Sequence, residues 1–169
     1  MKPEDRARQN IDKLLEAAGW DVQELTELDL KAALGVVVTY FPLNSGIADY
    51  LLFVDGKAVG VIEAKPEGTT LSGVAEQSDK YVGGYPSNLP HVQEPLSFAY
   101  ESTGVETFFR DLRDPDTRSR RVFSFHKPET LLEWVGQANT LRARLKSQPA
   151  LIETGLRECQ ITAIKNLEE

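Results

Sequence analysis

The sequence contains little cysteine, little histidine and few positive charges, and it has no long apolar run. A single cysteine, Cys159, cannot form an internal disulfide, and it leaves no basis for a multi-cysteine zinc site. Every apolar stretch falls short of the roughly 20 residues that a membrane-spanning helix needs. The charged N-terminal residues are not typical of a secretory signal. We therefore expect a cytoplasmic protein without a membrane segment.

Basic residues are outnumbered by acidic ones, with 19 Lys and Arg against 26 Asp and Glu, and the net charge is -7 at pH 7. Because DNA attracts basic surfaces, this balance argues against a stand-alone nucleic-acid binder. It leaves open an enzyme that acts on nucleic acid with the help of other subunits. The phosphate-binding pattern G-x-x-x-x-G-K-[ST] is also absent, so we do not expect this chain to bind ATP productively.

The remaining composition is that of an ordinary globular domain, and its apolar patterns alternate between helical and extended spacing. Helices are predicted over 4–18, 70–82 and 129–146, with a helical turn over 26–34. Strands are predicted over 20–25, 36–41, 48–54, 57–65, 96–101, 105–112 and 121–125. This order predicts an α/β fold with a central mixed β-sheet flanked by helices. We expect residues 1–147 to form the domain and 148–169 to form a linker and a last helix.

Two acidic residues and a lysine fall at the ends of two neighbouring strands. Asp55-Gly56 is a strong hairpin signal between 48–54 and 57–65. A plain two-residue turn would pair Asp49 with Ile62, so that Glu63 would point away from Asp49. A three-residue turn or one β-bulge would instead bring Asp49, Glu63 and Lys65 to the same face. We predict the irregular register.

Carboxylates that lie this close repel each other unless a cation lies between them. Mg²⁺ suits such oxygen ligands, and the Ala64 carbonyl could supply another. A metal of this kind would activate water and polarise a phosphoryl oxygen, while Lys65 would orient the water or stabilise charge on the phosphate. The alternative is a solvated strand end on which Asp49, Glu63 and Lys65 form a weak surface ion pair.

The stretch "GIADYLLFVDGKAVGVIEAK" resembles the core of the PD-(D/E)xK nuclease superfamily. Asp49 matches the metal-binding aspartate of the motif, Glu63 its second acid and Lys65 its lysine. Ala48 stands where the nominal motif has proline. The resemblance implies a restriction-endonuclease-like core and magnesium-dependent cleavage of DNA.

A narrower resemblance, to the R subunits of type I restriction enzymes, rests on the segments around this core. Gln77 and Tyr81 resemble a Q-x-x-x-Y motif, and "EDRARQNIDKLLEAAGWDV" resembles the opening helix and first strand of those subunits. The resemblance implies that Gln77 and Tyr81 support double-stranded DNA, and that Glu4 lies near the metal. It also implies a methyltransferase subunit and a specificity subunit as partners.

The C-terminal residues resemble the start of a superfamily 2 motor. Arg157 and Gln160 match an R-x-x-Q element in which the glutamine reads the adenine of ATP. The motor itself is missing, so this resemblance implies ATP only for a longer protein. An ordinary amphipathic helix is the alternative for these residues.

Two further functions remain open from the sequence. The fold could serve as a catalytically silent docking or DNA-guiding module of a motor complex, or as a PD-(D/E)xK nuclease of another DNA-processing system. The most basic stretch, 110–127, could contact DNA phosphates, or it could form a solvated loop with local ion pairs.

Overall fold

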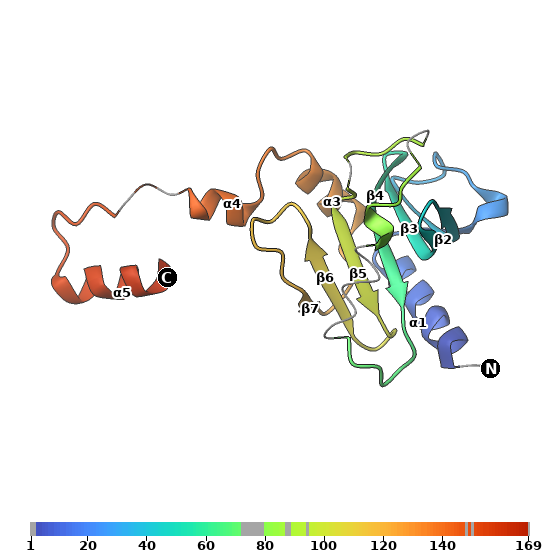
Figure 1. Ribbon diagram of the computed structural model, residues 1–169, viewed down its shortest axis with the longest axis horizontal. Coiled ribbons are helices and arrows are strands. Elements are labelled where there is room, and N and C mark those ends of the chain that lie inside the picture. Colours follow the sequence, from blue (N-terminus) through green and yellow to red (C-terminus); the bar gives the residue numbers. More distant parts are fainter. Residues whose placement is uncertain are drawn as a thin grey trace.

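A computed structural model describes residues 3–71, 80–86, 89–93, 95–147, 149 and 151–168. Its centre is a seven-stranded sheet in which spatial order follows chain order (Figure 1). The strands are β1 (Asp21–Glu24), β2 (Gly35–Leu43), β3 (Gly46–Val54), β4 (Lys57–Ala64), β5 (Phe98–Ser102), β6 (Thr107–Asp111) and β7 (Arg120–Val122). The helices are α1 (Pro3–Ala17), α3 (Pro128–Val135), α4 (Leu141–Lys146) and α5 (Glu158–Glu168), with a 3₁₀ turn, η1 (Leu25–Glu27).

The sheet is mixed, as the sequence predicts. The pairs β1–β2 and β4–β5 are parallel. The other neighbouring strands are antiparallel. Each parallel pair needs a crossover, and the connection from β4 to β5 is the segment that contains the predicted helix 70–82. Most of that helix lies outside the described residues, although 80–82 are helical.

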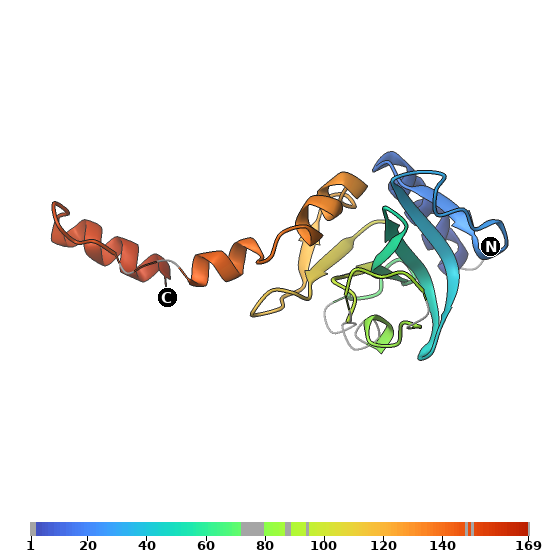
Figure 2. The same ribbon diagram turned by 90° about the horizontal axis from the view of Figure 1, so that it is seen from above.

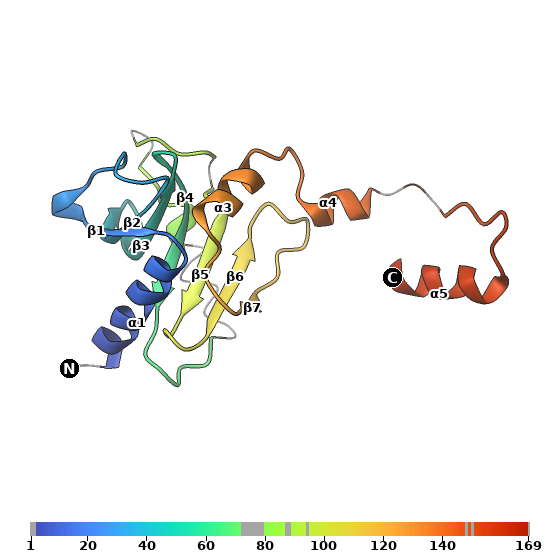
Figure 3. The same ribbon diagram turned by 180° about the vertical axis from the view of Figure 1, so that it is seen from behind.

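Each face of the sheet packs on a separate hydrophobic cluster. On one face, Ile11 and Leu15 of α1 and Leu131 of α3 cover the central strands. On the other face, Val82 and Tyr85 of the β4–β5 connection cover them. Figures 2 and 3 show α1 and α3 on the same side of the sheet, with residues 80–86 on the opposite side. Burial on both faces explains why β3 and β4 read as continuous apolar runs.

The β3–β4 hairpin has the predicted irregular register. A two-residue turn pairs Val54 with Lys57, and the pairing then shifts by one residue between Leu52 and Phe53. Asp55 and Gly56 both have positive φ, of 50° and 71°, as a tight turn of this kind requires. Beyond the shift Tyr50 pairs with Ile62, and continuation of that register sets Asp49 opposite Glu63. The β-bulge therefore places the two acids opposite each other in the register of the hairpin.

Two predicted helices differ from the structure. The helical turn expected over 26–34 is limited to η1, and the following residues form irregular turns. The single helix expected over 129–146 is divided into α3 and α4. Gly136 ends α3, and the Thr140 side chain caps α4 by accepting a hydrogen bond from the Ala143 N–H at 3.2 Å. Glycine is typical of the end of a helix, and threonine is typical of the position just before one. The prediction missed the break because it relied on apolar spacing alone.

The C-terminal residues extend from the sheet as a separate arm, at the end of which lies α5 (Figure 1). No helix among the described residues combines the length and the apolar character that crossing a membrane requires.

Candidate active site

Asp49, Glu63 and Lys65 lie together at the C-terminal end of β4. The Lys65 Nζ donates to Glu63 Oε1 at 2.8 Å, and the backbone N–H of Ala64 donates to Asp49 Oδ2 at 2.8 Å. Glu63 is 7% exposed, and the Lys65 side chain is also largely covered. The group is therefore a half-buried cluster, in contrast to the fully solvated surface pair that the sequence left open.

Asp49 lies where the regular alternation of β3 side chains between the two faces of the sheet is broken. Leu51 and Ala48 both belong to the same hydrophobic cluster, although strict alternation would put them on opposite faces. The alternation is also broken at the matching position of β2, as shown by Val38 and Phe41, which both belong to that cluster. Between them Tyr40 has φ of 50°, a left-handed conformation that is uncommon for a non-glycine residue. Such backbone distortions cluster at functional sites.

Arg8 of α1 is a site residue that the sequence analysis missed. Its guanidinium forms an ion pair with Asp49 Oδ1 and lies over the Tyr40 ring, 4.8 Å from the centroid. The hydroxyl of Tyr50 holds the same helix by donating to Asp12 Oδ1 at 2.8 Å. Arg8 lies next to the apolar stripe of α1 in the sequence, but which strand residue it would meet depends on tertiary packing.

A close approach of backbones positions this part of α1. Gly104, in the turn between β5 and β6, has φ of 76°, and a Cβ built on it would lie 2.8 Å from the Ala7 carbonyl oxygen. Only glycine fits both the conformation and the space. The turn Ser102-Thr103-Gly104 thus holds α1 against the sheet beside Arg8.

The electrostatics of the site centre on Glu63. Burial raises the pKa of its carboxyl, and repulsion from Asp49 adds to this, while the hydrogen bond from Lys65 opposes both. Glu63 Oε2 is buried and accepts no hydrogen bond from the described residues. A buried carboxylate oxygen without a donor is costly, so this atom is suited to receive a ligand that is positively charged.

The other predicted site residues are placed as follows. Tyr81 is half-buried, and its ring lies beside the start of β3, where a Cβ built on Gly46 would be 3.3 Å from it. Burial, with the negative charges of Glu63 and Asp49, raises the pKa of its hydroxyl. Gln77 lies outside the described residues. Glu4 is exposed in the first turn of α1, and the described residues give it no hydrogen bond or ion pair. Gln160 is exposed in α5, where its Oε1 accepts the Arg157 N–H at 2.9 Å.

A buried ion pair lies beside the cluster on the next strand. Glu101 of β5 is opposite Glu63 in the parallel register and is 1% exposed. Arg110 of β6 donates to its Oε1 at 3.1 Å. Four of the five arginines between 110 and 121 have carboxylate partners within the described residues, Arg118 being the exception. Local ion pairing therefore accounts for much of the basic stretch.

The donor set at the site fits a single hard cation. Among the described residues no group of three or more His, Cys, Asp and Glu side chains converges, so the site offers two carboxylates. Ala64 ends an extended strand, and the N–H and C=O of such a residue project to the same side. Since its N–H meets Asp49, its carbonyl faces the same strand. Two carboxylates with one carbonyl suit Mg²⁺, which keeps most of its waters.

Comparison with known proteins finds similarity to one group of proteins. Residues 35–105 match the family described as the second domain of the type I restriction enzyme EcoKI endonuclease subunit. The chain is 25% identical to the EcoKI endonuclease subunit of Escherichia coli (strain K12), over 98% of this chain and 18% of that protein. It thus spans about a fifth of the length of this curated relative.

A solved structure shows the same fold. It is a fragment assigned to an HsdR subunit of a type I restriction enzyme from Vibrio vulnificus YJ016, with a TM-score of 0.56 and 20% identity. The match covers 79% of this chain and 25% of that one. In sequence, this chain is therefore similar to the endonuclease subunits of type I restriction enzymes.

Proposed function

We propose that this chain is the metal-dependent endonuclease domain of a type I restriction enzyme R subunit, and that it hydrolyses phosphodiester bonds of double-stranded DNA. The observation that carries the proposal is the β-bulge that sets Asp49 opposite Glu63, with Lys65 bonded to Glu63 at 2.8 Å. A hairpin with a regular register would separate the two acids. The relationship to endonuclease subunits supports the same reading.

In this proposal Asp49, Glu63 and the Ala64 carbonyl hold Mg²⁺, which when bound would supply an activated water and neutralise charge on the scissile phosphate. The unpartnered Oε2 of Glu63 is the atom best suited to that role. Arg8 orients Asp49 through their ion pair. Because Arg8 shares that carboxylate, it also competes with a metal ion for it.

The cations and donors around the carboxylates would handle the DNA. In the hydrolysis the water oxygen forms a bond to phosphorus, the P–O bond to the leaving sugar oxygen breaks, and a proton from the water ends on that oxygen. Lys65 would donate a hydrogen bond to the attacking water or to a phosphate oxygen. Tyr81 would pack against the DNA backbone, and Gln77 would donate a hydrogen bond to a DNA phosphate. Sequence recognition would come from a specificity subunit, which acts with a methyltransferase subunit, in the cytoplasm. ATP would be used only by a motor in the longer subunit, with Gln160 near its adenine.

The test is plasmid cleavage with Mg²⁺ by the complete restriction complex, comparing wild type with Lys65→Ala and measuring ATP hydrolysis in parallel. We expect cleavage to fall at least 100-fold while ATP hydrolysis persists, because loss of one group that stabilises transition-state charge has effects of that order. Lys57→Ala is the matched control, since Lys57 lies on the same strand at its exposed other end.

Cleavage by Lys65→Ala at the wild-type rate would contradict the proposal and favour a docking or DNA-guiding module.

Metal binding gives a readout that does not need activity. In calorimetric titration with Mg²⁺, Glu63→Gln should weaken binding at least tenfold, whereas Glu67→Gln, an exposed change of the same type, should not.

A further inference from the structure

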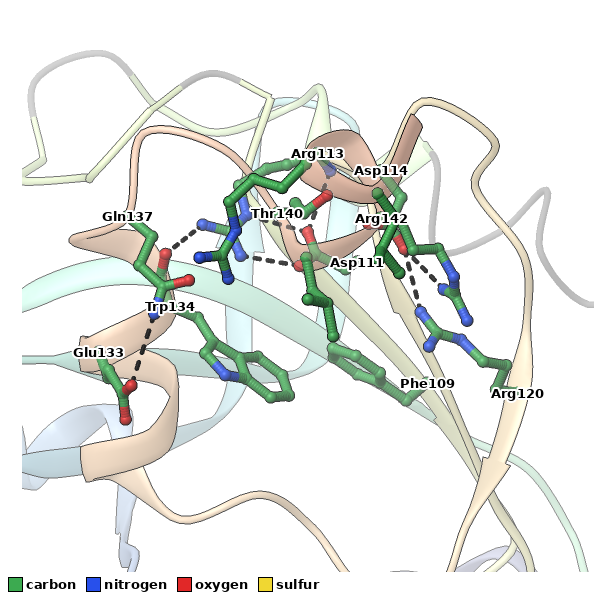
Figure 4. Close-up of a pocket in the computed structure, with 13 residues that line it drawn as sticks. Phe109, Asp111, Arg113, Asp114, Arg120, Glu133, Trp134, Gln137, Thr140 and Arg142 are labelled. Carbon is green, nitrogen blue, oxygen red and sulfur yellow. Dashed lines mark hydrogen bonds and ion pairs between the residues drawn. The ribbon is translucent and has the colours of Figure 1, made fainter. Parts of the chain in front are cut away.

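A cavity lies at the opposite end of the sheet from the candidate active site. It has a volume of about 480 Å³ and is lined by the end of β6, the loop to β7, α3 and α4 (Figure 4). Asp111 of its wall pairs with Phe98, the first residue of β5, whereas Glu63 and Ala64 pair with the last two residues of that strand. The two places are therefore roughly 13 Å apart along the strand, at about 3.3 Å per residue.

The inner wall of the cavity is closed by a saturated ion pair. Arg113 donates from Nε to Asp111 Oδ1 at 2.9 Å and from Nη2 to Oδ2 at 2.7 Å. Its Nη1 donates to the Trp134 carbonyl at 2.5 Å. This bidentate geometry ties β6 to α3, and it leaves Arg113 little capacity for another ligand.

The outer wall holds more cations than its carboxylate can satisfy. Arg120 and Arg142 both donate to the same atom, Asp114 Oδ2, at 3.1 and 2.8 Å. Each guanidinium has five N–H donors, so most of theirs remain available. Arg120 Nε is buried and has no hydrogen-bond acceptor among the described residues. Arg144 also lines the cavity, is exposed, and has no ion pair within the described part of the chain.

The lining of the cavity holds four arginines and three carboxylates, so it has a local surplus of about one positive charge in a protein whose net charge is -7. The remaining acid of the lining, Glu133, is bonded to Gln137 at 3.4 Å. Figure 4 shows both on the side of the cavity away from Arg120 and Arg142. Asp114 is therefore the carboxylate that Arg120 and Arg142 share.

We propose that this cavity binds a phosphate group through Arg120, Arg142 and Arg144. The planar, forked donors of arginine match the oxygens of a phosphate in pairs, and converging arginines are typical of phosphate sites. The phosphate can come from the backbone of DNA or from a free nucleotide, since both offer the same oxyanion. Because the cavity lies at the other end of β5 from Glu63, the bound phosphate is not the one that is cleaved.

The test measures binding of inorganic phosphate to the purified chain by calorimetry, at a constant ionic strength set with chloride. The variants are Arg144→Gln alone and the double change Arg142→Gln with Arg144→Gln. Two controls remove the same charge outside the cavity: Arg121→Gln on β7, paired with exposed Glu106, and Lys146→Gln on α4, paired with exposed Asp116. Circular dichroism confirms that each variant folds.

We expect the double variant to bind phosphate at least tenfold more weakly than wild type, and the controls to stay within twofold. Arg144→Gln tests the proposal even if the double variant does not fold, because its side chain holds no ion pair among the described residues; it should weaken binding at least threefold. No binding by wild type, or equal losses in the controls, would overturn the proposal. Parallel titrations use ADP and a 20-base-pair duplex, a length of about two helical turns. If the double variant loses affinity for the duplex as it does for phosphate, the phosphate comes from the DNA backbone. If it loses affinity for ADP instead, the phosphate comes from a nucleotide.

Discussion

The two ends of the sheet treat charge in opposite ways. At the β4 end, carboxylates lie close to each other, one oxygen of Glu63 has no donor, and the pKa of Glu63 is raised. At the β6 end, arginines outnumber the outer carboxylate, and burial together with Arg120 lowers the pKa of nearby His126. Burial is the largest cause of both pKa shifts, and Asp49 at one end and Arg120 at the other add to it. The comparison teaches that one end is prepared for a cation and the other for an anion.

The largest expected effect comes from opening the saturated pair at the β6 end. Arg113→Leu leaves Asp111 buried without its cation and removes the hydrogen bond to Trp134. We expect the free energy of unfolding to fall by about 3–5 kcal/mol, as for other broken buried pairs. Urea denaturation measures it. Arg121→Leu, which breaks an exposed pair, should change stability by no more than about 1 kcal/mol, and a similar loss in both would show that Arg113 is not special.

A smaller effect distinguishes two buried glutamates that are neighbours across β4 and β5. Glu63→Gln removes a charge that burial and Asp49 disfavour, so we expect thermal stability at pH 7 to rise by about 1 kcal/mol, as is usual when a functional residue is relieved. Glu101→Gln weakens the buried pair with Arg110, and it should lower stability by about 1.5–3 kcal/mol. Differential scanning calorimetry of both variants gives the comparison. Destabilisation of equal size by both would mean that Glu63 is as well satisfied as Glu101.

The sign for Glu63 also predicts a pH dependence. Its folded-state pKa lies above the unfolded value, so its contribution to stability is fully present below the unfolded pKa and is lost as pH rises through the folded one. Glu63→Gln should therefore have its greatest advantage over wild type above this window and lose it in acid. Urea denaturation from pH 4 to 8 measures the difference, and an advantage that grows in acid would contradict the assignment.

The smallest effect concerns His126, whose ring packs against Phe109. Its Nδ1 forms a hydrogen bond with the Tyr100 hydroxyl at 2.7 Å. Because its pKa is lowered on folding, the stability it contributes is present above the unfolded pKa of about 6.5 and is lost as pH falls through the folded value. His126→Gln should flatten this decline by up to about 1.4 kcal/mol per pH unit. Equal slopes in wild type and His126→Gln would refute the prediction.

Much of the fold follows from local patterns. The apolar runs of β3 and β4 and the turn Asp55-Gly56 predict the hairpin, and the need to share a face predicts its β-bulge. The break at Gly136 was also present in the sequence as a glycine followed by a capping threonine, but apolar spacing masked it. Predicting local structure succeeds where neighbouring residues decide it.

The candidate site was only partly accessible to such reasoning. Asp49, Glu63 and Lys65 lie on adjoining strands, so strand register alone brings them together. Arg8 reaches Asp49 from a helix far away in the sequence, and the tilt of that helix depends on contacts such as the one at Gly104. The same holds for Arg120 and Arg142, which meet on Asp114 from two separate elements. The catalytic and metal-binding roles remain predictions.

The β-bulge between β3 and β4 has a consequence for how this hairpin can change over evolution. A strand turns its side chains over with every residue, so a change of one residue within the paired part of either strand reverses one acid relative to the other, whereas a change of two keeps both facing the same way. A change of one residue in the turn at Asp55-Gly56 leaves the pairing beyond the turn as it is. Related hairpins that keep both acids should therefore vary freely in the length of the turn, while their paired strands should differ by even numbers of residues where the β-bulge is retained. The length of a paired strand, which no single side chain reveals, becomes a heritable mark of whether the two acids can act together.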